Sequence, residues 1–126
     1  MRLIDDEMGK LVDSQLLDLY FSENGSAPVG YIQNLYNFFC LRVNERFSLA
    51  RTQLRLGEMD VFKKHLHVLQ NSFLNVGARQ MANACQQLDS RMQKLTRHQI
   101  LNCLDIFEEK AEMVRQELQD LIQSRL

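Results

Sequence analysis

The sequence contains few of the residues that interrupt helices and few of those that favour sheets. Its 126 residues include one proline, five glycines and few β-branched side chains. This composition strongly favours helix over sheet. No run of about 18 apolar residues occurs, so the sequence offers no candidate for a membrane-spanning helix.

Neither sign of charge is in excess. Fifteen basic residues face sixteen acidic ones, and a net charge of −1 gives no overall electrostatic reason to bind nucleic acid. The first ten residues, MRLIDDEMGK, are acidic where a secretory signal needs an apolar core. We therefore expect a protein that stays inside the cell, with residues 1–126 forming a single domain.

Sequence patterns for metal, cofactor or nucleophile sites are also missing. The three cysteines, Cys40, Cys85 and Cys103, are far apart, odd in number and without metal-ligand spacing. Each lies in or beside an apolar stripe, which predicts small core residues, with a redox or metal role as the alternative. His65 and His67 should lie on different sides of a helix. With no HExxH motif and no phosphate-binding glycine loop, we expect no metal and no cofactor.

Apolar residues at steps of three and four predict four long amphipathic helices. They cover residues 28–55, 59–76 and 79–95, and a last helix that follows Thr96. Short loops between such helices predict an all-α fold, an antiparallel four-helix bundle. Residues 3–21 add one or two short extra N-terminal helices around Leu11, Leu16, Leu17 and Tyr20. A coiled coil is the alternative, although repeated helix-end signals argue against it.

Those end signals are specific. Pro28 suits a first helical turn, and Gly57 and Gly77 suit the positions just after a helix. Thr96 and Gln99 have the spacing of a capping box. The inward residues are expected to be Ile32, Tyr36, Phe39, Val43, Phe47, Ala50 and Leu54; Phe62, Leu66, Leu69, Phe73 and Val76; Met81, Cys85, Leu88, Met92 and Leu95; and Ile100, Leu104, Phe107, Ala111, Val114, Leu118 and Leu121.

His67 is predicted to lie on the exposed face of the second long helix. On a helical wheel at about 100° per residue, Leu74, Lys63, Asn71 and Gln70 fall within roughly 60° of it. The apolar stripe points away from this group. An exposed histidine on a helix is by composition alone an ordinary surface residue, and an exposed Leu74 beside it is unusual.

The segment around His67 resembles the signature of histidine-containing phosphotransfer (HPt) proteins, especially the plant type. That signature is H-x-L-K-G-S followed by small residues and Gly-Ala; here it is HVLQNSFLNVGA, residues 67–78, without a gap. The likeness continues into Asn83, Ala84 and Cys85. Upstream it includes the Phe39–Cys40 pair and Asp60, so it covers most of residues 25–122.

This resemblance implies a phosphorelay carrier rather than an enzyme. His67 would accept a phosphoryl group from the receiver domain of a sensor histidine kinase and pass it to a response-regulator aspartate. Neutral histidine is a good nucleophile near neutral pH, and the receiver would supply Mg²⁺. In plants such carriers serve cytokinin signalling and move between cytoplasm and nucleus. No nucleic acid or membrane partner is implied.

The sequence departs from the family pattern close to His67. The family lysine is Gln70, which can donate a hydrogen bond but brings no cation. The family glycine is Asn71, which adds bulk where a receiver approaches. Lys63, one turn before His67, is the expected substitute for the missing cation. Lys64 and His65 are expected to add basic character for docking, and Leu74 makes the same surface more apolar.

Three functions remain open at this point. The first is a working carrier, fast or slow, that uses His67 with support from Gln70 and Lys63. The second is a pseudo-HPt protein, which binds receivers through Lys64, Asn71 and Leu74 but transfers poorly and damps the signal. The third is a helical scaffold or oligomerisation module in which Leu74 belongs to a self-association patch.

Overall fold

The computed structural model describes residues 11–13 and 29–124, and within these ranges all regular structure is helical. Four α-helices are present in this part of the chain: α2 (Val29–Leu56), α3 (Met59–Asn75), α4 (Arg79–Arg91) and α5 (Arg97–Ser124). A 3₁₀ turn, η1 (Met92–Lys94), follows α4. The predicted all-α class is confirmed for these residues. None of the described helices is both long enough and apolar enough to cross a membrane.

The helix ends follow the predicted signals closely. Gly57 and Gly77 adopt φ of 76° and 78° directly after α2 and near the end of α3. These angles are easy for glycine and strained for other residues, so glycine stops each helix. The capping box is confirmed: Gln99 N donates to Thr96 Oγ1 at 3.1 Å, and Thr96 N donates to Gln99 Oε1 at 2.9 Å. Pro28 lies outside the described residues.

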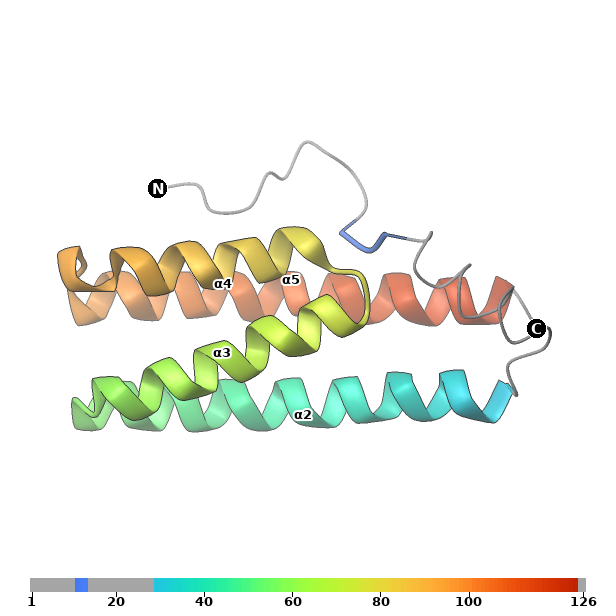
Figure 1. Cartoon of the computed structure of the whole chain (residues 1–126), viewed down its shortest axis with the longest axis horizontal. Helices are drawn as coiled ribbons and strands as arrows, with labels where there is room; N and C mark the ends of the chain where they lie inside the picture. Colours follow the sequence, from blue (N-terminus) through green and yellow to red (C-terminus); the bar gives the residue numbers. More distant parts are fainter. Residues whose placement is uncertain (1–10, 14–28, 125–126) are drawn as a thin grey trace.

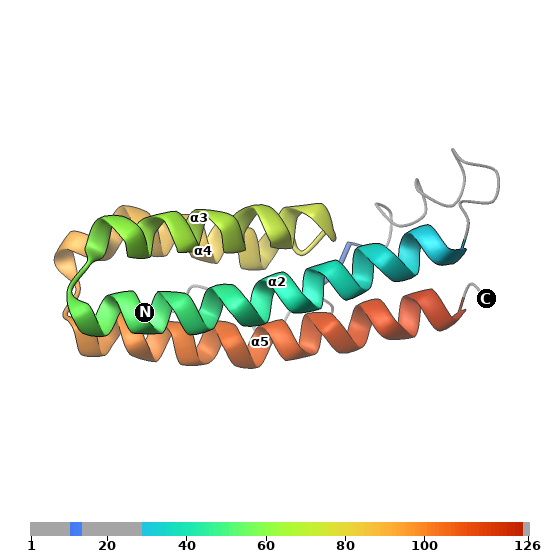
Figure 2. The same ribbon diagram turned by 90° about the horizontal axis from the view of Figure 1, so that it is seen from below.

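The four helices pack side by side. Helix α2 contacts α3 and α5, and α4 contacts α3 and α5. Figures 1 and 2 show α2 and α5 extending past α3 and α4 at one end of the molecule. The pair α3–α4 therefore covers only part of the length of the pair α2–α5, and its exposed side is where the candidate site lies.

The predicted inward residues form the core. All are buried except Tyr36, Leu95 and Leu121, which are partly buried and pack against it. One large apolar cluster joins residues from all four helices, and a small second cluster of Ile32 and Ile122 lies between α2 and α5. Ile122 is buried instead of the predicted Leu121, because a long helix drifts away from a strict seven-residue repeat.

One predicted helix end is wrong. The third helix was expected to continue to Leu95, but α4 ends at Arg91 and a 3₁₀ turn follows. Met92 stays buried through this change, so the apolar spacing alone could not reveal it. Tyr36 packs against the core, as its place on the predicted stripe indicated, and its hydroxyl accepts a hydrogen bond from Arg115 Nη1 at 2.9 Å, which keeps its polar end near the surface.

A short N-terminal segment is fastened to the helices. Leu11 and Val12 are buried, the Leu11 amide donates to the Glu117 carboxylate at 2.8 and 3.0 Å, and the Asp13 amide donates to the Gly77 carbonyl at 2.9 Å. Residues 11–13 are not helical, so the short helix predicted around Leu11 is not formed at these positions. The remaining residues on which the extra N-terminal helices were predicted lie outside the described residues.

Candidate functional site

Helix α3 presents His67 on its outer face near the middle of the helix. Phe62, Leu66, Leu69 and Phe73 are buried on the opposite face, which fixes the rotation of the helix about its axis. The side chain of His67 is 56% exposed. The predicted exposure of this histidine is therefore confirmed, while its chemical role stays a prediction.

Asp89 of α4 contacts the His67 imidazole. Its Oδ2 lies 3.3 Å from Nε2, and the carboxylate side chain is 28% exposed. The other oxygen, Oδ1, is buried and accepts no hydrogen bond from the described residues. A carboxylate can only accept, so the contact is a hydrogen bond when Nε2 bears a proton. Asp89 thus holds a negative charge directly beside the candidate phosphoacceptor.

Sequence reasoning missed Asp89. The contact joins two helices, and helical spacing reports only on neighbours within one helix. The sequence shows only that Asp89 follows the inward Leu88 in the predicted third helix, and it does not show which side chain of a neighbouring helix Asp89 contacts.

The other predicted site residues share the outer side of α3 with His67. Lys63 and Gln70 are partly buried, one turn before and one turn after it. Lys64 and Asn71 are exposed, and Leu74 is 46% exposed. The expected residues therefore share one surface of α3 with His67. Within the described residues, no hydrogen bond links Lys63 or Gln70 to the imidazole.

The expectation for His65 is wrong. This residue is buried, and its Nδ1 accepts a hydrogen bond from Arg46 Nη1 at 3.1 Å. Burial lowers the pKa of His65, and the Arg46 guanidinium lowers it further, against a smaller opposing effect of Glu45. His65 is therefore a neutral structural residue near pH 7, and it adds no positive charge to the surface near His67.

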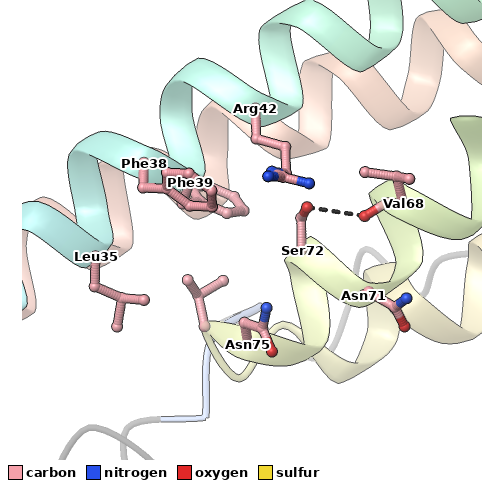
Figure 3. Close-up of a pocket in the computed structure, with 9 residues that line it drawn as sticks. Leu35, Phe38, Phe39, Arg42, Val68, Asn71, Ser72 and Asn75 are labelled. Carbon is pink, nitrogen blue, oxygen red and sulfur yellow. Dashed lines mark hydrogen bonds between the residues drawn. The ribbon is translucent and has the colours of Figure 1, made fainter.

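A groove lies between α2 and α3, next to the site. Its volume is about 290 Å³, and Asn71 is one of the residues that line it. Figure 3 shows side chains of both helices facing it, and the Arg42 guanidinium stands 4.6 Å from the centre of the Phe38 ring. Phe38 lies outside the apolar stripe predicted for this helix, and it is 56% exposed. The lining residues are Leu35, Phe38, Phe39, Arg42, Val68, Asn71, Ser72, Asn75 and Val76.

The cysteines are free thiols. Cys85 is buried as predicted, and burial raises the pKa of its thiol to about 12. Cys40 and Cys103 are partly buried against the core, and burial raises their pKa values as well. Thiolate chemistry is thus suppressed near neutral pH. Among residues 11–13 and 29–124, no three His, Cys, Asp or Glu side chains gather as metal ligands would.

Comparison with known proteins gives no assignment. No family model matches the chain, and neither a curated protein nor a solved structure matches it significantly.

Proposed function

We propose that this protein is an HPt-type phosphorelay carrier, an antiparallel four-helix bundle that accepts a phosphoryl group on His67. The observation that supports it best is the exposed imidazole at mid-helix, within the HPt-like segment of residues 67–78. The order of helix contacts and the short links between the helices support the antiparallel arrangement. The partners would be receiver domains of kinases and response regulators, in cytoplasm and nucleus.

In this proposal the carrier contributes a nucleophile on a rigid support. A lone pair of His67 forms a nitrogen–phosphorus bond as the acyl phosphate bond of the donor aspartate breaks, and the aspartate carboxylate leaves with the bonding electrons. Four buried aromatic and aliphatic side chains hold α3 in place, so the imidazole is presented with little loss of orientation. The receiver supplies Mg²⁺ and most of the charge stabilisation.

The receiver would dock on the outer surface of α3. Leu74 offers an apolar contact, Asn71 offers hydrogen bonds, and Lys64 offers a positive charge to an acidic receiver surface. Lys63 and Gln70 flank His67 and would support the phosphoryl oxygens. Because Gln70 has no charge, Lys63 would supply the cation that the HPt signature places at the position of Gln70.

The contact with Asp89 favours a second candidate, the pseudo-HPt protein. A phosphoryl group on Nε2 would meet the carboxylate at close range. Two unit charges about 4 Å apart repel by about 1 kcal/mol in water and about 4 kcal/mol at an effective dielectric of 20. Each 1.36 kcal/mol is about tenfold in rate. If transfer uses Nε2, Asp89 would add to the effects of Gln70 and Asn71 and give a protein that binds receivers but transfers slowly.

A transfer assay separates these functions. A receiver domain carrying labelled acyl phosphate is mixed with the protein and Mg²⁺, and acid-labile label on the carrier is followed over time. We expect label on the wild type and on His98→Gln, whose histidine is exposed on α5, and none on His67→Gln. Receiver binding without label would support the pseudo-HPt candidate. If no receiver binds at all, the proposal is wrong and a scaffold role gains support.

A further inference from the structure

The contact between Asp89 and His67 leads to a statement about which nitrogen reacts. We propose that Asp89 is a positioning residue: it keeps the proton of neutral His67 on Nε2 and leaves Nδ1 as the nucleophile that takes the phosphoryl group. The second half of this statement rests on the proposed function. The first half concerns the free protein and can be tested without any partner.

The argument for the proton starts from hydrogen-bonding capacity. A neutral imidazole has one N–H and one lone pair, and an ionised carboxylate only accepts. With Nε2 3.3 Å from Asp89 Oδ2, a proton on Nε2 makes a hydrogen bond, whereas a lone pair there would face a negative oxygen. Elsewhere in the described chain nothing donates to this carboxylate, and its Oδ1 is buried and unpaired. Among the described residues, the Nε2 proton is therefore the only one that can form a hydrogen bond to this carboxylate.

The same geometry leaves Nδ1 available. No described residue forms a hydrogen bond with His67 Nδ1, and more than half of the side chain is exposed. The hydrogen bond made by one ring nitrogen sets the tautomer and thus the role of the other. His67 therefore presents the lone pair of Nδ1 to an incoming partner.

Charge favours the same nitrogen during the reaction. As Nδ1 forms its bond to phosphorus, the acyl P–O bond breaks and the donor carboxylate leaves with the electron pair. The ring becomes positive and keeps its Nε2 proton, which stays hydrogen-bonded to Asp89. A carboxylate behind a reacting histidine stabilises such a cation in serine hydrolases. Reaction at Nε2 would instead remove this hydrogen bond and bring phosphoryl oxygens beside Asp89.

Long-range ¹H–¹⁵N correlation spectra of the free protein test the place of the proton. At about pH 8 most imidazoles are neutral, and the exposed His98 serves as an internal reference. We expect the two ring-nitrogen shifts of His67 to be further apart than those of His98, with Nε2 the protonated one. In Asp89→Asn, the separation between the two ring-nitrogen shifts of His67 should become the same as that of His98. If the two ring-nitrogen shifts were equally far apart in His67 and His98 of the wild type, the proposal would be overturned.

The site of phosphorylation is read from the ¹⁵N–³¹P coupling of the labelled carrier. We expect the Nδ1 isomer in the wild type and in Asp120→Asn, which removes an exposed charge on α5, and a larger share of the Nε2 isomer in Asp89→Asn. A wild type labelled on Nε2 would contradict the inference. If the wild type takes no label, the carrier function fails, and the spectra of the free protein still decide whether Asp89 holds the proton.

Circular dichroism of Asp89→Asn checks that the fold survives, which is expected because the two side chains have nearly the same shape. A merely structural role for Asp89 would change stability and leave the nitrogen shifts of His67 unaltered, and that result would also overturn the proposal.

Discussion

Two histidines two positions apart on α3 are in opposite environments. His65 is buried and accepts a hydrogen bond from Arg46, whereas His67 is exposed and contacts Asp89. The difference comes from helix geometry, since positions two apart lie on different sides of the helix. Burial and the Arg46 guanidinium lower the pKa of His65 and keep it neutral, whereas His67 contacts a carboxylate at the surface.

His65 should make the protein less stable in mild acid. Its pKa is lowered in the folded chain, so the unfolded chain binds more protons as the pH falls through the usual histidine value of about 6.5. The free energy of unfolding should then decrease, by at most about 1.4 kcal/mol per pH unit for one proton. Urea unfolding of the wild type and His65→Gln at pH 7.5 and 5.5 should show a smaller decrease in the variant.

His98→Gln is the matched control, because the same change is made at an exposed position. It should keep the pH dependence of the wild type. A His65→Gln variant with an unchanged pH dependence would show that His65 is not the group that titrates.

Introducing the lysine and the glycine of the HPt signature tests the chemistry beside His67. Gln70→Lys adds a cation one turn away, and Asn71→Gly removes bulk from the lining of the groove. Losing one donor that stabilises the transition state slows enzyme reactions by about two orders of magnitude. We expect the double variant to take up label faster, by up to about that factor, in a single-turnover assay. Unchanged kinetics would mean that these two positions do not limit transfer.

At the scale of elements, the helices were predictable because their signals are local. Regular apolar spacing predicted the buried face of α3. The helix ends were predicted from Gly57, Gly77 and the Thr96–Gln99 capping box. The 3₁₀ turn after α4 was not predictable, since Met92 keeps the apolar spacing through it. His67 could be found by spacing and resemblance. Asp89 could not, because its place depends on how α4 packs against α3.

The capping box should stabilise the start of α5. Thr96→Ala removes the hydroxyl that accepts from the Gln99 amide and is expected to lower the free energy of unfolding by about 1 kcal/mol. Chemical denaturation provides the measurement. Thr52→Ala is the control: its hydroxyl bonds to the Ser48 carbonyl inside α2, where such a bond contributes little, so its effect should be much smaller. Equal effects would argue against the cap.

At the scale of the whole molecule, one core cluster joins the four helices and should unfold as a unit. Cys85 lies within it, and burial raises the pKa of its thiol to about 12. In a Cys40→Ala, Cys103→Ala background, a thiol reagent should therefore label Cys85 only when the fold opens. Labelling and far-ultraviolet circular dichroism should give the same denaturation midpoint. A lower midpoint for labelling would reveal opening of α4 alone.

The segment at residues 11–13 has a practical consequence for the design of shortened proteins. It ties α5 to the turn between α3 and α4, through Glu117 and the Gly77 carbonyl, and Arg79 adds an ion pair with Asp13 at 3.6 Å. A version trimmed to begin at α2 would leave an apolar hollow where Leu11 and Val12 sit and would free the turn that ends α3. Expression boundaries chosen for crystals or spectra should therefore begin before residue 11, even when only the helices are of interest.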